Sequence, residues 1–352
     1  MKYSIIVPVF NRPNEVDELL ESLRRQSFKD FEVIIVEDGS IKPCKDVCDK
    51  YAEILALHYY YKRNSGPGQS RNYGAERAHG EYLIILDSDV VLPEGYLQAI
   101  EKSLEGNFEK VPCFGGPDAS HPSFTPIQKA ISYSMTSFFT TGGIRGSSPQ
   151  SGGTRGALDK FYPRSFNMGI HRDVYQQLGG FSKMRFGEDI DFSYRIVEAG
   201  YRPQLFSEAW VWHKRRTDFQ KFFRQVYNSG IARINLEKRH PGTMKLVHLL
   251  PTVFTAGVIF CCLGTFIAAI LILLSIVHGS WPIVFLSPLL LYSILICIDS
   301  ANSNKSILVG LLSVPAAFVQ LMGYGFGFIE AWWKRCLLKQ DEFTAFEKNF
   351  YK

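Results

Sequence analysis

The feature of this sequence that most constrains its fold is the near-complete loss of charge in its C-terminal part. Charged and apolar residues are mixed up to about Pro241, as in a soluble domain, whereas charges nearly vanish from Leu246 to Trp333. Three apolar stretches lie there, at about 249–277, 283–298 and 307–333. A transmembrane helix needs about 20 consecutive apolar residues, so the first and third stretches are long enough to span a bilayer. The chain is therefore expected to join a soluble domain to a membrane region.

The middle apolar stretch leaves two topologies open, because it is short and contains Pro288. Either all three stretches span, or the middle one is re-entrant and two true spans remain. We expect two to three transmembrane helices within residues 241–336 and a C-terminal tail at residues 337–352. Of the two topologies we favour the one that leaves this tail in the cytoplasm.

A basic run from His213 to His240 precedes the first apolar stretch. Under the positive-inside rule, this run keeps the N-terminal domain in the cytoplasm. The apolar run near Met1 is too short for a signal peptide and meets Asn11-Arg12-Pro13 at once, which favours the same side. The expected location is the cytoplasmic (inner) membrane, crossed more than once, with the N-terminal domain facing the cytoplasm.

Charge and cysteine content narrow the function classes. The net charge of +5 is mild, and much of the excess lies in the basic run. That position favours binding to a membrane surface or to phosphate over binding to nucleic acid. The seven cysteines are odd in number and have no framework spacing, and no second pair follows Cys44 and Cys48. We therefore expect ordinary reduced cysteines.

Strand and helix signals alternate along the first 240 residues. The predicted strands are Tyr3–Phe10, Phe31–Val36, Leu55–Tyr61 and Tyr82–Leu86. The predicted helices are one capped by Asn14, then 45–53 and Ser70–Ala78 after a loop at Gly66-Pro67-Gly68. Beyond an irregular region, ordered segments return at Ser165–Ile170, Val174–Leu178, a helix at Asp189–Ala199 and a strand at Leu205–Trp212. This alternation predicts an α/β fold with a mostly parallel sheet covered on both faces.

Polar side chains gather where these predicted strands end. They are Asn11-Arg12, Asp38, Arg63-Asn64 and the pair Asp87 and Asp89. In open parallel sheets, ligands collect at the carboxyl ends of the strands. This edge is therefore the expected binding site. The glycine- and serine-rich residues 140–156 are either a loop over that site or a disordered insert.

Asp87-Ser88-Asp89 is the sharpest of these signals. Two carboxylates one residue apart on a turn can point the same way and hold a hard divalent cation such as Mg²⁺ or Mn²⁺. Such a cation can bridge the phosphates of a nucleotide diphosphate. An Asp-rich turn that caps the next helix would have the same sequence. His213, after a predicted strand, is a candidate third ligand, although a lone histidine is more often structural.

Three more positions have both a functional and a structural interpretation. Asp38 could bind a base or ribose, or form a turn before a glycine. Arg71 follows a glycine-rich loop and opens a helix, where it could bind phosphate. Asp189 could deprotonate an acceptor hydroxyl, or favour the helix start electrostatically. Asp191 lies close by and is a candidate for the capping role.

Five short segments together resemble glycosyltransferase family 2, the inverting transferases of the GT-A fold. In the family's order they are SIIVPVFNR, VIIVEDGS, NSGPGQSRNYGAERAHGEYLIILDSDV, NMGIHRDVYQQLGGF and GEDIDFSYRIVEAG. The resemblance covers roughly residues 3–240. It implies a Rossmann-like GT-A domain at residues 1–240 and a nucleotide diphosphate sugar as donor, with a UDP-sugar expected over a GDP-sugar from family frequency. A NAD-dependent enzyme is excluded, since no GxGxxG follows the first strand.

The resemblance also implies roles for individual residues. Contacts to the nucleotide sugar are implied for Pro8, Phe10, Arg12, Asp38, Arg71, Asp87 and Ser88. Binding of a divalent cation, Mn²⁺ or Mg²⁺, is implied for Asp87, Asp89 and His213. Asp189 matches the position of the catalytic base. Glu188, Arg215 and Arg216 are candidates for binding the acceptor or a pyrophosphate.

Departures from the family's patterns leave more than one function open. Asp89 is followed by Val90-Val91-Leu92-Pro93, not by the Leu-Gln of polyprenyl-phosphate sugar synthases, and the QxxRW motif of processive synthases is absent. Residues 223–230 are similar to bacterial exopolysaccharide and cell-envelope transferases. The expected function is metal-dependent, inverting transfer of a sugar to a hydroxyl of a glycan or lipid-linked acceptor at the membrane, as in polysaccharide biosynthesis. A polyprenyl-phosphate sugar synthase and a non-catalytic membrane protein with a degenerate GT-A fold are the alternatives.

Overall fold

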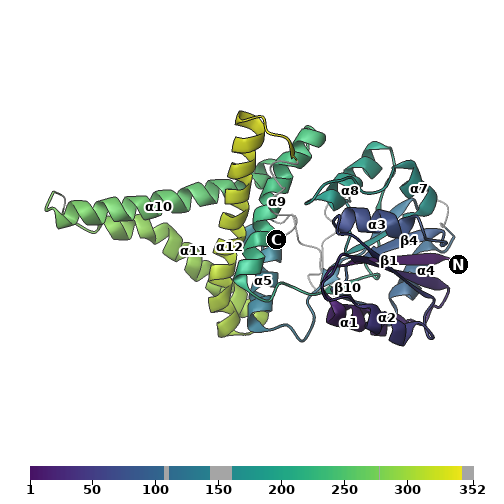
Figure 1. The fold of residues 1–352 in the computed structure, drawn as a ribbon. Helices are drawn as coiled ribbons and strands as arrows, with labels where there is room; N and C mark the ends of the chain where they lie inside the picture. The colour runs from purple at the N-terminus through teal and green to yellow at the C-terminus, as the bar shows by residue number, and fades with distance from the viewer. Residues whose placement is uncertain (107–110, 143–160, 277, 343–352) are drawn as a thin grey trace. The chain divides into compact units, whose positions relative to one another are not determined.

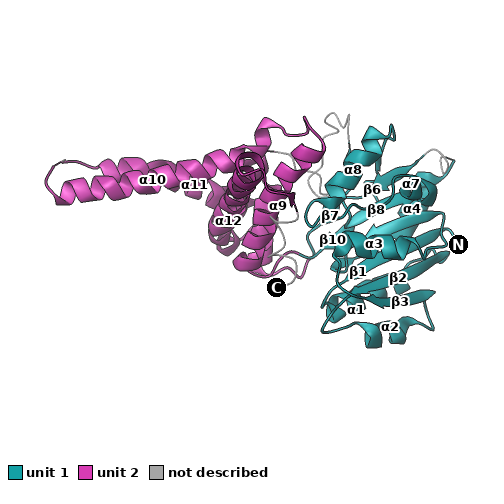
Figure 2. Ribbon diagram, turned by 45° about the horizontal axis from the view of Figure 1, so that its top comes forward, with its two compact units in different colours: residues 1–121, 147–214, 348–352 teal, residues 122–146, 215–347 magenta. Residues whose placement is uncertain are grey.

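The computed structural model describes residues 1–106, 111–142, 161–276 and 278–342. These residues form two compact units (Figure 2). Described residues up to 121 and from 161 to 214 belong to unit 1, and residues 122–142 and 215–342 belong to unit 2. The stretch at 140–156 lies outside the described residues beyond Gly142, so the two interpretations of it stay open.

Unit 1 is built on a seven-stranded sheet with the order β3-β2-β1-β4-β8-β6-β9. The strands are β1 (Tyr3–Val9), β2 (Phe31–Asp38), β3 (Leu57–Lys62), β4 (Tyr82–Leu86), β6 (Cys113–Gly115), β8 (Asn167–His171) and β9 (Gln204–Leu205). Strands β1 to β4 are parallel to one another, and β8 runs antiparallel to both β4 and β6. The prediction of an α/β fold with a mostly parallel sheet is therefore confirmed.

Helices cover both faces of this sheet, as Figure 1 shows for α1 and α3. The helices of unit 1 are α1 (Pro13–Arg24), α2 (Lys45–Tyr51), α3 (Pro67–Ala75), α4 (Tyr96–Leu104), α7 (Arg172–Gln177) and α8 (Glu188–Glu198). Alternate residues of the strands point to opposite faces, so Ile5 and Val33 pack under α1, α2 and α4. Ile6 and Ile34 pack on the other face, against α3, α7 and α8. The near-continuous apolar strands follow from this double covering.

Two predicted helix starts are wrong, and proline is the reason in both. Helix α1 begins at Pro13, with Arg12 as the N-cap residue, so Asn14 lies in the first turn instead of capping it. Helix α3 begins at Pro67, directly after Gly66 at a φ of 89°, although the sequence predicted a loop there. Proline suits the first helical position because its φ is already helical and the amide hydrogen it lacks would have no partner there.

The predicted strand at Leu205–Trp212 is two short strands in two different sheets. Its beginning is β9, whose following residue Phe206 donates its N–H to the carbonyl of Gly115 at 2.9 Å. Its end is β10 (Val211–His213), which joins β5 (Val90–Val91) and β7 (Asp118–Ala119) in a three-stranded sheet. In this sheet His213 pairs with Val90, one residue after the Asp87-Ser88-Asp89 turn. The break in the strand thus determines where His213 lies.

Unit 2 consists of helices. They are α5 (Pro126–Thr136), α6 (Phe138–Thr141), α9 (Phe219–Arg239), α10 (Leu250–Leu273), α11 (Trp281–Asn304) and α12 (Ile307–Trp332), with a short 3-10 helix at Leu246–His248 and a π-helical turn at Trp333–Leu337. Three continuous helical segments, Leu246–Leu273, Trp281–Asn304 and Ile307–Leu337, are long and apolar enough to cross a membrane. The middle one remains a 24-residue helix despite Pro288. The number of crossings and the side of the C-terminus stay predictions.

Helices α9 and α12 approach each other closely through glycine. A Cβ atom at Gly327 of α12 would lie 2.0 Å from the carbonyl oxygen of Tyr227 in α9. A Cβ atom at Gly230 of α9 would lie 2.1 Å from the carbonyl oxygen of Tyr324 in α12. Neither position has room for a side chain, so the two backbones meet directly.

Candidate active site

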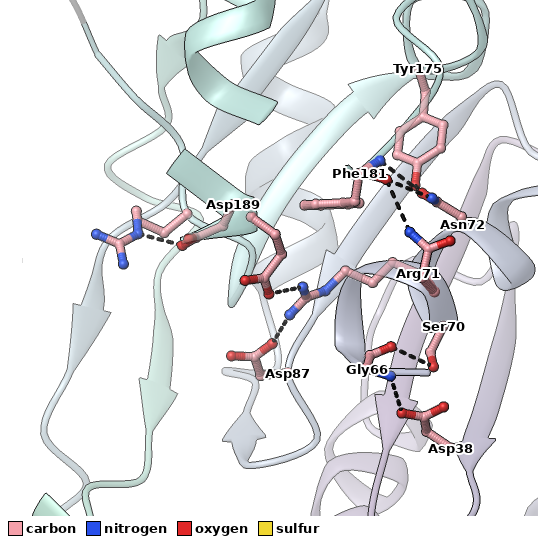
Figure 3. Close-up of polar contacts among 12 residues, drawn as sticks. Asp38, Gly66, Ser70, Arg71, Asn72, Asp87, Tyr175, Phe181 and Asp189 are labelled. Atoms are coloured by element: carbon pink, nitrogen blue, oxygen red, sulfur yellow. Dashed lines mark hydrogen bonds and ion pairs between the residues drawn. The ribbon is translucent and has the colours of Figure 1, made fainter. Parts of the chain in front are cut away.

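Asp38, the last residue of β2, fixes the loop that leads into α3. Its Oδ2 accepts the N–H of Gly66 at 2.9 Å (Figure 3). Its Oδ1 accepts the N–H of Ser65 at 2.9 Å, and Lys62 forms an ion pair with it. The side chain is buried. Both carboxylate oxygens of Asp38 are therefore bound to its own loop, and a further contact to a nucleotide stays a prediction.

Arg71 points from α3 toward the carboxyl edge of the sheet and joins two carboxylates (Figure 3). Its Nη2 donates to Asp87 Oδ1 and its Nη1 donates to Glu188 Oε1, both at 2.9 Å. Burial by itself would lower the pKa of the guanidinium, but Asp87 and Glu188 outweigh it and raise that pKa. Arg71 therefore stays charged, and it connects the strand-end turn to the start of α8.

Glu188 and Asp189 open α8, after Gly187 in the left-handed region at a φ of 83°. The Nε of Arg164 donates to Asp189 Oδ2 at 2.6 Å. Burial would raise the pKa of Asp189, but Arg164 and then Arg71 outweigh it and hold that pKa below the usual value. Burial does raise the pKa of Glu188, since Arg71 offsets it only in part. At neutral pH Asp189 is a carboxylate able to accept a proton.

Asp87, Asp89 and His213 converge on one point. Each offers one ligand atom, and these atoms all lie within 4.8 Å of one another. The Nε2 of His213 is 3.3 Å from Asp89 Oδ1, and Arg12 forms an ion pair with the same carboxylate. The structure brings these three predicted residues together, whereas their role as metal ligands stays a proposal.

The donor atoms suit a divalent cation. Two carboxylates and a neutral imidazole are ligands that Mn²⁺ accepts, and Mg²⁺ accepts the carboxylates. The ring of His213 stacks on Phe166, with centroids 5.0 Å apart and planes inclined by 28°. Its Nδ1 is buried and makes no hydrogen bond to any described residue. The imidazole is therefore oriented by packing on Phe166, with Nε2 turned toward Asp89.

The remaining predicted site residues are spread over both units. Phe10 is 49% exposed just after β1, Pro8 is half-buried within β1, and Ser88 is buried. Arg215 and Arg216 belong to unit 2, where the carbonyl of Arg215 accepts a hydrogen bond from Gln128 of α5 at 3.1 Å. Nothing in the geometry within either unit assigns a ligand to these residues, and their roles stay predictions.

Sequence analysis missed Arg164 and Phe166, which contact two of the predicted site residues. Both lie at 161–166, a segment without helix or strand that follows the irregular region. No periodic pattern or spacing marks them. Asn167, which begins one of the segments that resemble the family, was given no role there; its Nδ2 donates to the carbonyl of Ala209 at 2.7 Å and thereby ties β8 to the segment before β10.

Two family models match the chain. The model of "Glycosyl transferase family 2" matches residues 4–159, and that of "Glycosyl transferase family group 2" matches residues 82–298, more than half of the chain. These matched regions include the turn with Asp87 and Asp89. The second also includes α8 and β10, and therefore Asp189 and His213.

Curated relatives match over shorter segments. An uncharacterized glycosyltransferase of Rickettsia felis is 36% identical over 145 residues, which is 41% of this chain and 23% of that protein. The poly(ribitol-phosphate) beta-N-acetylglucosaminyltransferase TarS of Staphylococcus aureus is 40% identical over 93 residues, 25% of this chain and 16% of that protein. The match to each of these two relatives thus spans less than a quarter of the relative's length.

A solved structure shows the fold over nearly the whole chain. The mannosyltransferase PcManGT from Pyrobaculum calidifontis, in complex with GDP-Man and Mn²⁺, superposes with a TM-score of 0.61. The alignment covers 95% of this chain and 88% of that one, at 15% sequence identity. With the family match over more than half of its length and this GT-A neighbour, the chain belongs to the family 2 glycosyltransferases and is a glycosyltransferase of the GT-A fold.

Proposed function

We propose that this glycosyltransferase moves a sugar from a nucleotide diphosphate sugar to a hydroxyl of a glycan or lipid-linked acceptor, with inversion and with the help of a divalent cation. The observation that carries the proposal is the convergence of Asp87, Asp89 and His213 at the carboxyl edge of the sheet, to which Arg71 connects Glu188, the neighbour of Asp189 at the start of α8. Ligands of open parallel sheets bind at this edge.

The donor is proposed to be held by the strand ends. The GDP-Man and Mn²⁺ named for PcManGT support a nucleotide sugar and a divalent cation, and family resemblance favours a UDP-sugar. A cation bound by Asp87, Asp89 and His213 would neutralise charge on the leaving diphosphate. Arg71, charged and next to Asp87, would do the same from the side of α3. Phe10, Arg12 and Asp38 are the proposed contacts of the nucleotide.

Asp189 is the proposed general base. It would take the proton of the acceptor hydroxyl as that oxygen attacks the anomeric carbon from the face opposite the diphosphate, which inverts the configuration. Two features support this role: Asp189 is ionised, and it begins α8 next to Glu188, which binds Arg71. Arg164 would hold the carboxylate in one orientation through its 2.6 Å hydrogen bond.

The acceptor is proposed to reach the enzyme at the cytoplasmic face of the inner membrane. Three helical segments long and apolar enough to cross a bilayer support a membrane location. The end of α12 is proposed to lie at the membrane–water interface. Trp332 and Trp333 are exposed there and are followed by Lys334 and Arg335, which supports this position. The basic residues Arg215 and Arg216 are proposed to bind an acceptor's pyrophosphate or anionic lipid.

Binding measured by calorimetry tests the donor and metal assignment. The full chain in detergent should bind a nucleoside diphosphate only when Mn²⁺ or Mg²⁺ is present, and Asp89→Ala should abolish this metal-dependent binding. Asp173→Ala is a matched control, because its carboxylate is 78% exposed on α7. If Asp89→Ala retained the affinity of the unaltered chain for the metal–nucleotide complex, the assignment of Asp89 would be wrong.

A further inference from the structure

A second group of ligating side chains lies at the amino-terminal edge of the same sheet. It consists of Glu32 at the start of β2, His58 in β3 and His79 shortly after α3. Asp38, at the other end of β2, is six residues from Glu32, which corresponds to about 20 Å along a strand. The group is therefore well separated from the candidate active site, and the proposed function does not use it.

The carboxylate of Glu32 is buried and held in a fixed orientation. Its side chain is 1% exposed, and its Oε1 accepts hydrogen bonds from Ser4 Oγ at 2.6 Å and from the N–H of His79 at 2.7 Å. The other oxygen, Oε2, lies 3.4 Å from His58 Nε2 and 3.2 Å from His79 Nδ1. One carboxylate oxygen thus meets two imidazole nitrogens that come from different elements of the fold.

This buried carboxylate has no permanent positive partner within the described part of the chain. Its ion-pair partners there are His58 and His79, and no lysine or arginine nitrogen of the described residues forms an ion pair with it. A buried carboxylate is costly unless a positive charge compensates it. Imidazole carries no fixed charge at neutral pH, but it is the commonest metal ligand in proteins. Glu32 already accepts hydrogen bonds from Ser4 and from the N–H of His79, and its Oε2 is within hydrogen-bonding distance of His79 Nδ1, so a bound cation would add the fixed positive charge that these contacts lack.

We propose that Glu32, His58 and His79 bind a zinc ion or a similar divalent transition metal. Two histidines and one carboxylate are a donor set that zinc takes, with a water in the fourth position. In a tetrahedral site with bonds of about 2.0–2.1 Å, neighbouring ligand atoms are about 3.3 Å apart. The two O···N distances of 3.2 and 3.4 Å match this spacing.

The third edge of the site, between the two imidazoles, is open in this structure: the ligand atoms of Glu32, His58 and His79 do not all lie within 4.8 Å of one another, so binding an ion requires the rings to move. The ring centroids of His58 and His79 are 6.5 Å apart, which is wider than two ligands of one tetrahedral ion. The side chains of His58 and His79 are 45% and 75% exposed, so both rings can rotate toward each other without disturbing the core. The buried Glu32 remains the fixed point of the site.

The bound ion would join three parts of unit 1. Glu32 belongs to β2 and His58 to β3, whereas His79 lies in the connection between α3 and β4. Helix α3 carries Arg71, so an ion at this edge would fasten the end of α3 remote from the active site. Its expected consequence is stability of the fold, because a ligand that binds the folded state alone stabilises it by mass action.

Zinc titration of the full chain in detergent tests the site. Metal is first removed with a chelator, and excess Mg²⁺ is then added, since this hard cation prefers oxygen ligands and competes at the Asp87 and Asp89 carboxylates. We expect the protein to bind one equivalent of zinc, and we expect this binding to raise the melting temperature of the protein. The double variant His58→Gln with His79→Gln should weaken this binding by more than about a hundredfold, beyond the usual cost of losing an outer-shell partner.

Two comparisons make the outcome decisive. His278→Gln removes another exposed histidine, outside the proposed site, and should bind zinc like the unaltered chain. The double variant should melt at the same temperature as the unaltered chain when chelator is present, which shows that it folds. Equal zinc affinity of the double variant and the unaltered chain would overturn the proposal, as would the absence of zinc binding by the unaltered chain. Both results are independent of the transferase proposal, because neither involves a donor sugar.

Discussion

The carboxyl edge of unit 1 and the α9–α12 pair of unit 2 are stabilised by opposite means. At the edge, buried charges neutralise one another, as Arg71 does between Asp87 and Glu188. Between α9 and α12, glycines let two backbones touch, as at Gly327. Burying an unpaired charge is costly, whereas a position where two backbones already touch has no room for added atoms. The stability of the carboxyl edge should therefore fall when a charged side chain is removed, and the stability of the α9–α12 pair should fall when a side chain is enlarged.

The largest stability effect is expected at Arg71. Arg71→Met removes the positive partner of two carboxylates, and breaking a buried ion pair in this way costs about 3–5 kcal/mol. Lys45→Met is the control, because Lys45 pairs with Asp49 and both side chains are exposed, and such surface pairs contribute little to stability. Denaturant unfolding of both variants measures the difference. Equal losses would contradict the view that paired charges hold this edge together.

The next effect is expected in unit 2. Gly327→Val places atoms where the carbonyl of Tyr227 lies and should destabilise the protein by about 1–3 kcal/mol, as overpacking does. Gly257→Val in α10 is the matched control, since no atom lies within 4 Å of its added Cβ. Thermal unfolding in detergent compares the two variants. A melting temperature for Gly327→Val equal to that of Gly257→Val would refute direct backbone contact between α9 and α12.

A smaller effect is expected in the pH dependence of transfer. Arg164 helps hold the pKa of Asp189 below its usual value, so the base stays ionised as the pH falls and the acid limb of kcat lies at low pH. In Arg164→Gln, the positive charge that offsets the burial of Asp189 is lost, so the pKa of Asp189 rises. The acid limb of the kcat profile should therefore move to higher pH. Arg202→Gln, at an exposed position, should leave the limb in place. A shift in the opposite direction would exclude Asp189 as the group that titrates.

Much of unit 1 was predictable because its signals are local. Continuous apolar runs determine β1, β2 and β4, and the turn with Asp87 and Asp89 follows β4 directly. Helix starts were less predictable, since Asn14 was expected to cap the first helix and Pro67 to lie in a loop, whereas Pro13 and Pro67 each begin a helix. The apolar helices of unit 2 were predictable from length and composition alone.

The rest of the candidate site depends on contacts between distant residues. The pairing of His213 with Val90 involves strands of only two and three residues, which leave no pattern in the sequence. The position of His213 after a predicted strand made it a candidate ligand, and the family resemblance strengthened that prediction. Arg164 lies in a segment without periodicity, so its ion pair with Asp189 appears only when the chain is folded.

Donor binding and transfer by Asp189→Asn test the central claim most directly. Asparagine keeps the size of the side chain and its capacity for hydrogen bonds, but it cannot take up a proton. The account predicts that the variant binds the nucleotide sugar with the affinity of the unaltered chain, while transfer to an acceptor falls by about a hundredfold or more. Near-full transfer by Asp189→Asn, with normal donor affinity, would contradict the account and remove Asp189 from the chemistry.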